Sequence, residues 1–217
     1  METAIRQPRL TRPEARIFLQ PVAAPAVLGY FALASALFIY GSWFAQWWGT
    51  ETDASSFCPF LLLFGGVGQL AAGLWGYRAR AAVAAALHGS WGAFWLGLGL
   101  IYWLATTHTI NVPARGEEWQ SLGQWLIYMA IITATTAFAV LPRSPVGFLM
   151  QGTLATGSLI AAIALIAGSA GWQQVGGLLF VVAAALAFAV GAVLMLSGGS
   201  GELVEYERGD PGVKVGQ

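Results

Sequence analysis

The charged residues of this chain are confined to short stretches that separate six long uncharged runs. A bilayer-spanning helix needs about 20 mainly apolar residues, so each run is long enough to cross a membrane. The runs are continuous and rich in Ala, Leu and Gly, whereas the strands of a membrane β-barrel give short alternating segments. The pattern therefore predicts six membrane-spanning helices, which cover residues 24–46, 57–76, 81–104, 121–141, 146–168 and 172–197.

The composition agrees with a chain whose solvent is lipid. Hydrophobic residues make up 57% of the chain and charged residues 9%, whereas a soluble domain carries roughly 25% charged residues. These values exclude an ordinary soluble domain, and they exclude a disordered chain, which needs low hydrophobicity and high charge. The formal net charge of zero gives no sign of a nucleic-acid partner, and the single cysteine excludes an internal disulfide. We expect an all-α, polytopic membrane protein whose bundle of six transmembrane helices spans residues 24–197.

The distribution of basic residues predicts the orientation of the bundle. Basic residues accumulate in cytosolic loops, and an even number of spans places both ends of the chain on the same side. That side carries most of the basic residues: Arg6, Arg9, Arg12, Arg16, Arg78, Arg80, Arg143, Arg208 and Lys214. The opposite side carries Arg115 among acidic residues. We therefore expect residues 1–23 to form a cytosolic N-terminal tail and residues 198–217 to form a flexible cytosolic C-terminal tail.

Few polar side chains lie inside the predicted spans. His88 is the one ionisable residue well inside a span, and it is either a neutral imidazole bonded to a neighbouring helix or a titrating residue on a pathway. Gln69 is costly in lipid without a partner, so it either joins two helices or lines a pathway. The hydroxyls of Thr133, Thr135 and Thr136 bond their own preceding turn or line a wet path.

The sequence does not predict catalysis. The spans hold no nucleophile elbow, phosphate loop or metal-ligand cluster, so we expect no enzyme activity, no metal and no cofactor. A haem held by His88 and His108 is disfavoured, because twenty residues of one helix separate them by about 30 Å. Small residues recur every four positions, as Gly68, Ala72 and Gly76 and as Ala85, Gly89, Ala93 and Gly97. Gly65, Gln69 and Gly73 share an adjacent stripe of the second span. Such stripes let helices approach closely, either within one bundle or between subunits.

Two segments resemble a known family. Residues 64–78 read Phe-Gly-Gly-Val-Gly-Gln-Leu-Ala-Ala-Gly-Leu-Trp-Gly-Tyr-Arg and are similar to the second-span signature of the acetate uptake transporter family, which includes bacterial succinate–acetate permeases. Residues 90–96 read Ser-Trp-Gly-Ala-Phe-Trp-Leu and resemble that family's third-span Ser-Tyr-Gly-Ser-Phe-Trp-Leu. The family's first-span motif, Asn-Pro-Ala-Pro-Leu-Gly-Leu, is matched at Pro25, Ala26, Leu28 and Gly29. Ala24, Val27 and Gly76 depart from the family pattern.

The resemblance implies a homo-oligomer of hexamer type in a bacterial inner (plasma) membrane, in which each subunit has its own pathway for a small carboxylate. It places an apolar constriction at Leu33, Trp91 and Leu154. The topology puts these residues about 12 to 15 Å deep in spans that run the same way, so they share one layer. Candidate pathway groups are the first-span motif, whose helix start offers unpaired N–H groups, and the donors Gln69, Ser90 and Thr153.

These features predict a membrane transporter or channel for acetate or a similar small monocarboxylate, with proton coupling as an option and His88 as the possible titrating residue. The alternative hypothesis is a structural or stress-related multispan protein that transports nothing, which the departures at Ala24 and Gly76 favour. A membrane enzyme is the weakest hypothesis, because the spans offer only His88 as a base.

Overall fold

A computed structural model describes residues 24–50 and 53–197. Every element in these ranges is helical, as the all-α prediction requires. The elements are α1 (Pro25–Phe44), α2 (Ala54–Phe60), η2 (Leu61–Gly68), α3 (Gln69–Arg78), α4 (Ala82–Thr106), α5 (Gln120–Val140), α6 (Pro145–Ile166) and α7 (Ala170–Leu196). The tails predicted at 1–23 and 198–217 lie outside the described residues.

The described helices form six spans, which confirms the predicted number. Elements α2, η2 and α3 follow one another without a break and act as one span from Ala54 to Arg78. All six are long and apolar enough to cross a membrane. The largest boundary difference is in this second span, which begins at Ala54 and not at residue 57. Helix geometry continues into the polar Ser55 and Ser56 because the first turn of a spanning helix can lie in the interfacial region.

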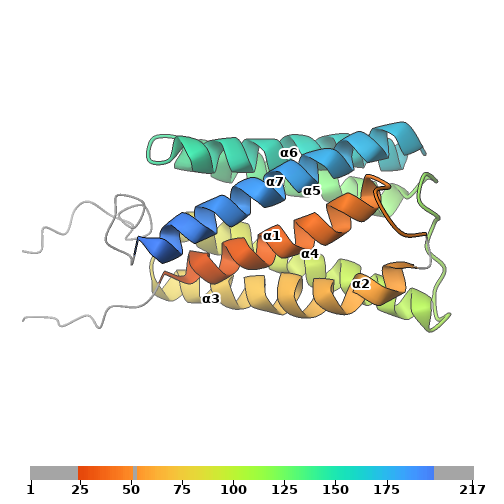
Figure 1. The fold of residues 1–217 in the computed structure, drawn as a ribbon, viewed down its shortest axis with the longest axis horizontal. Coiled ribbons are helices and arrows are strands. Elements are labelled where there is room, and N and C mark those ends of the chain that lie inside the picture. Colours follow the sequence, from red (N-terminus) through yellow and green to blue (C-terminus); the bar gives the residue numbers. More distant parts are fainter. Residues whose placement is uncertain (1–23, 51–52, 198–217) are drawn as a thin grey trace, which may run out of the picture.

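The spans pack as one bundle (Figure 1). Helix α6 packs against α5 and α7, α7 packs extensively against α1, α1 contacts η2, α3 and α4, and α4 contacts both the second span and α5. Helices α1 and α4 begin, and α3 and α7 end, at the same end of the bundle, which we call the proximal end. Residues 45–50 and the loop 107–119 lie at the opposite, distal end.

Glycines bring the second span and α4 into backbone contact. A Cβ added at Gly73 would lie 2.5 Å from Gly89 N, and one at Gly92 would lie 2.5 Å from Leu70 N. Gly66 likewise faces Leu96, and Gly99 faces Leu62. Small residues at these positions therefore serve close helix packing inside one chain, which is the first of the two uses that the sequence left open.

The predicted small-residue stripe on α4 is only partly correct. Ala85 faces α3, and the backbone of Gly89 contacts α3 although its side-chain position is open, but Ala93 is exposed and Gly97 faces Trp125 of α5. The contact continues instead through Gly92 and Gly99. A strict four-residue step turns a helix by about 400°, so the stripe drifts off the contact face, whereas alternating steps of three and four stay on it.

Element η2 is a π-helical segment that begins at Leu61, two residues after Pro59. Proline has no N–H to continue the regular helical bonding, and a wider turn is one way for a helix to absorb that loss. Within the segment, Gly65 faces Ala36 of α1 and Trp95 of α4, so α1 and α4 both approach the widened turn. The π segment ends at Gly68, and regular helix resumes at Gln69.

We predict that Gly73→Ala destabilises the bundle by about 1–3 kcal/mol, because the new methyl group meets backbone atoms that cannot rotate away. The matched control is Gly89→Ala on the opposing helix, where an added Cβ has nothing within 4 Å. The midpoint of thermal unfolding of the detergent-solubilised protein measures both. Equal midpoints for the two variants would contradict the proposed backbone contact.

Candidate functional site

Four fully buried side chains in the bundle have polar atoms without a hydrogen-bond partner among the described residues: Gln69, His88, Trp95 and Gln151. For Gln69, His88 and Gln151 both side-chain polar atoms are unpaired. A buried polar atom without a partner costs about 1–3 kcal/mol, so native structures keep few of them. Such a group commonly marks a place for water or a ligand, and we therefore build the candidate site from these residues.

His88 and Gln69 lie in the junction of α1, α3 and α4. Gly29 of α1 faces the His88 ring so closely that a Cβ there would collide with it, and the Tyr30 ring meets the His88 ring edge-on at 4.8 Å. The contact of Gly73 with Gly89 places His88 beside α3. The contact of Gly92 with Leu70 places Gln69 about one helical turn from His88 along α4. The first interpretation of His88 was a neutral imidazole bonded to a neighbouring helix. Among the described residues, His88 has no such hydrogen bond.

The three residues expected at the constriction lie in the same buried core. Leu33, Trp91 and Leu154 each have an exposed fraction of 0%. Trp91 Nε1 donates to Thr133 Oγ1 at 3.0 Å, which fixes the indole against α5. Gly123 near the start of α5 packs against Ala162 and Ile166 near the end of α6.

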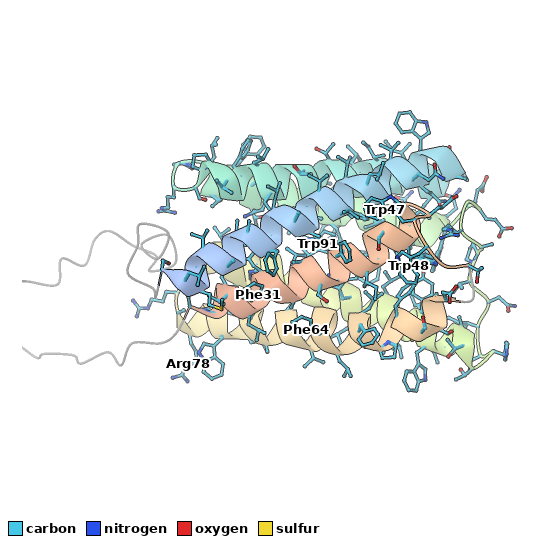
Figure 2. The ribbon with its side chains drawn as sticks, in the orientation of Figure 1. Phe31, Trp47, Trp48, Phe64, Arg78 and Trp91 are labelled. Atoms are coloured by element: carbon cyan, nitrogen blue, oxygen red, sulfur yellow. The ribbon has the colours of Figure 1, made fainter. Side chains whose placement is uncertain are left out.

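These contacts give the relative depth of two of the three residues, Trp91 and Leu154. Because α5 and α6 are antiparallel, the register of Gly123 against α6 places Thr133 at the depth of Leu154. Trp91, bonded to Thr133, therefore lies in the layer of Leu154, near the middle of the bundle length (Figure 2). The role of this layer as a constriction stays a prediction.

A column of aromatic rings runs from this layer toward the distal end. Ring centroids are 5.6 Å apart for Trp91 and Trp95, 5.8 Å for Trp95 and Tyr40, and 6.0 Å for Tyr40 and Trp43. All four side chains are buried, and Trp95 Nε1 is the unpaired donor in their midst. Sequence reasoning missed this column. The spacings Trp91/Trp95 and Tyr40/Trp43, which place each pair on one helix face, were the available signal.

The remaining predicted site residues have fewer contacts that relate them to Gln69, His88 and the apolar layer. Pro25 is the first residue of α1, Ala26 is fully buried, and none of the side chains in residues 24–50 and 53–197 caps this helix start. Leu28 is 44% exposed, so its side chain faces out of the bundle. Ser90 is half-buried. Thr153 Oγ1 donates to Leu149 O at 2.8 Å, so this hydroxyl bonds its own preceding turn.

Comparisons with known proteins were made once this geometry was established. A family model described as the GPR1/FUN34/yaaH family matches residues 7–200. The chain is 27% identical over 168 residues to "Ammonia transport outward protein 2" and 28% identical over 169 residues to "Accumulation of dyads protein 2", both of Saccharomyces cerevisiae (strain ATCC 204508 / S288c). Each match covers 76% of this chain and 59% of the relative, so the chain spans about three fifths of these relatives' length.

A solved structure shares the fold. The structure of the bacterial acetate channel SatP superimposes with a TM-score of 0.74 over 83% of this chain and 96% of that chain, at 22% sequence identity. The likeness shows that the six-span arrangement is one found in an experimental structure.

We predict opposite stability effects for two buried glutamines. Gln69→Leu raises stability by about 1 kcal/mol or more, because it removes an unpaired amide at similar volume. Gln173→Leu lowers stability by about 1–2 kcal/mol, because Gln173 Oε1 accepts from Gly116 N at 2.9 Å and that donor loses its acceptor. Thermal unfolding in detergent measures both changes. A loss for Gln69→Leu as large as that for Gln173→Leu would mean that Gln69 has a partner within the protein.

Proposed function

The chain belongs to the GPR1/FUN34/yaaH family, and we propose that it is a membrane transporter or channel for acetate or a similar small monocarboxylate. The observation that carries this proposal is the pair of unpaired, fully buried side chains Gln69 and His88 next to the apolar layer of Leu33, Trp91 and Leu154. A protein that only needed to fold would gain stability by replacing such groups with apolar ones.

The proposed pathway begins at the proximal end. A carboxylate loses much of its hydration on leaving water, so it needs hydrogen-bond donors on the way. The start of α1, at Pro25 and Ala26, has no side-chain cap from the described residues and carries the positive end of the helix dipole. Further in, the Gln69 amide and the His88 imidazole supply neutral donors, with Ser90 nearby on α4.

The apolar layer then acts as a gate. Leu33, Trp91 and Leu154 exclude water when they pack together, and a bulky apolar ring of this kind selects solutes by size and by the cost of dewetting. Because Trp91 is anchored to Thr133, movement of α4 against α5 is the expected way to open the layer. Thr153 joins the pathway only if its hydroxyl leaves Leu149 O.

His88 is the residue that we propose for any coupling to protons. It is the only His, Asp, Glu, Lys or Arg among the described residues of the spans that is fully buried. A neutral imidazole offers one donor and one acceptor, so it can hold a carboxyl group in either protonation state.

We also propose the orientation and assembly inferred from the sequence. Arg78, Arg80 and Arg143 lie at the proximal end, and Arg115 lies at the distal end with Asp53, Glu117 and Glu118. By the positive-inside rule we propose that the proximal end is cytosolic, and from the resemblance we propose a bacterial inner membrane. Exposed apolar side chains such as Leu63, Phe64 and Leu74 suit contact with lipid or with neighbouring subunits of a hexamer.

The test is uptake of labelled acetate by liposomes that contain the purified protein, compared with empty liposomes, at several pH values. Propionate and ammonia are further solutes, the latter because one similar protein is named for ammonia transport. Protein-dependent uptake of a monocarboxylate supports the proposal. If no monocarboxylate enters these liposomes faster than empty ones, the proposal is overturned. The alternative is then a non-transporting membrane protein, which the complete burial of the apolar layer favours.

We predict that Trp91→Ala increases acetate flux several-fold or admits larger carboxylates, because it removes the largest side chain from the gate. The control is Trp75→Ala, whose indole is 56% exposed on the outer face of α3. Since a buried Trp→Ala change costs about 3–5 kcal/mol, Trp91→Phe is compared as a milder variant that keeps an aromatic ring and loses the bond to Thr133 and part of the ring volume. Unchanged flux in correctly folded Trp91→Ala protein would make Trp91 a residue of the core alone.

A further inference from the structure

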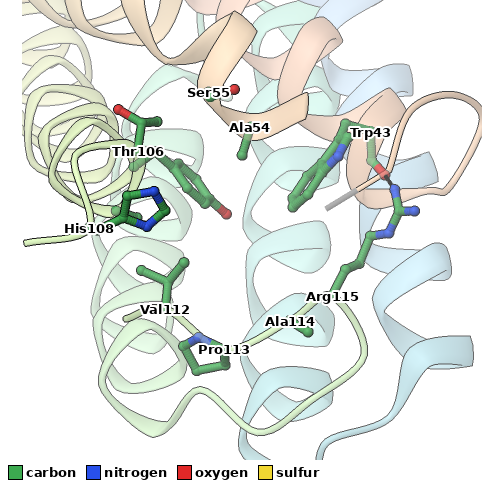
Figure 3. A pocket seen from close by; sticks show the side chains of 11 residues that line it. Trp43, Ala54, Ser55, Thr106, His108, Val112, Pro113, Ala114 and Arg115 are labelled. Atoms are coloured by element: carbon green, nitrogen blue, oxygen red, sulfur yellow. Dashed lines mark hydrogen bonds between the residues drawn. The ribbon is translucent and has the colours of Figure 1, made fainter. Parts of the chain in front are cut away.

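A pocket of about 380 Å³ opens at the distal end of the bundle, away from Gln69 and His88. It lies between the end of α1, the start of α2, the end of α4 and the loop that follows α4 (Figure 3). Pockets that hold drug-sized molecules measure about 300–1,000 Å³. The space is therefore much larger than a two-carbon acid needs.

The inner wall of the pocket is aromatic. Trp43 and Tyr102 are almost fully buried, and their rings meet edge-on with centroids 6.0 Å apart. Trp43 Nε1 donates to Thr50 O at 2.9 Å, which holds the indole in place. Ala54, Ala105 and Val112 add apolar surface, and the polar side chains Ser55, Thr106 and His108 also line the pocket. Because Trp43 and Tyr102 are nearly buried, an apolar group of a ligand would meet the parts of these rings that reach the pocket together with the aliphatic lining.

The pocket also carries a cation. The Arg115 guanidinium lies 5.1 Å from the centre of the Trp43 ring and donates to Trp43 O at 2.7 Å and to Gly49 O at 3.2 Å. Both acceptors are neutral carbonyls, and the two bonds use two of the five N–H donors of the guanidinium. None of the described residues that line the pocket is acidic.

The neighbouring carboxylate of Asp53 is bound elsewhere. Thr50 donates to Asp53 Oδ2 from its backbone N and, at 2.9 Å, from its hydroxyl. These bonds lower the pKa of Asp53 below its ordinary value, and the Arg115 charge makes the smallest contribution to that lowering. Asp53 does not line the pocket, so its charge does not occupy the site.

We propose that this pocket binds an amphipathic organic monocarboxylate, of the aromatic-acid class, with its carboxylate on Arg115 and its ring against Trp43 and Tyr102. An Arg–carboxylate pair gives directional, charge-assisted hydrogen bonds. The same indole ends the aromatic column that leads to Trp91. A molecule bound here therefore covers the distal mouth of the pathway and slows acetate flux, a consequence that rests on the proposed function.

The binding test uses the full chain in detergent and benzoate as the probe, with isothermal titration calorimetry as the readout. Benzamide, a neutral analogue of the same shape, is the matched ligand control. The variants are Arg115→Gln and, as a control that removes a charge at the proximal end, Arg143→Gln. We expect saturable benzoate binding that is at least about tenfold weaker for benzamide and for Arg115→Gln, and unchanged for Arg143→Gln.

Arg115→Gln loses the hydrogen bonds to Trp43 O and Gly49 O and could misfold for that reason, so a second variant tests the pocket independently. Ala105→Phe fills the pocket from α4 and leaves Arg115 in place, and we expect it to abolish benzoate binding. The site is overturned if benzoate does not saturate, if benzamide binds equally well, or if Ala105→Phe binds benzoate as the parent protein does.

Flux measurements separate this proposal from the preceding one. Benzoate added to the side of the distal end is expected to slow acetate uptake in proteoliposomes, and Ala105→Phe is expected to remove that inhibition. Benzoate binding without any effect on measurable acetate flux would overturn the blocking role. Benzoate binding in a protein that moves no monocarboxylate would overturn the proposed function and leave the binding site standing.

Discussion

Close backbone contact between the second span and α4 sets the geometry of the whole interior. The two helices can approach this closely because Gly73 and Gly92 have no side chain. A methyl group at either position would collide with backbone atoms of the other helix. In lipid, helices gain little from hiding apolar surface from one another, so such van der Waals contact is a main source of association. The same contact brings Gln69 and His88 to the junction with α1, where neither has a hydrogen-bond partner in the part of the chain that the structure describes.

The interior is thus divided along its length by chemistry. The proximal half holds neutral polar groups, the middle holds the apolar layer around Trp91, and the distal half holds aromatic rings that end at a pocket with one guanidinium. Neutral donors avoid the large cost of a fixed charge at membrane depth. The single cation stands at the distal end, where loops and water screen it, and it is held by carbonyls and by the Trp43 ring.

Much of this arrangement could be predicted from the sequence, because lipid imposes simple rules. Uncharged runs must be helices when no water is present to bond the backbone, so the six spans followed from charge spacing alone. The shared depth of Trp91 and Leu154 followed from counting residues into each span. The stripe on α4 was predicted incorrectly at Ala93, because four-residue spacing does not track a helix face over several turns. The distal pocket could not be predicted, since its walls come from four separate segments.

The sequence by itself determined the number of spans, their helical form and the few polar residues that lie inside them. The reason is that transfer of charged and unbonded groups into hydrocarbon is a local cost, which each segment bears alone. Only the tertiary structure decided which polar groups found partners: Trp91 bonds Thr133 and Gln173 bonds Gly116, whereas Gln69 and His88 stay unpaired. Such pairing depends on side chains far apart in the sequence, and helix contacts made elsewhere set their distances.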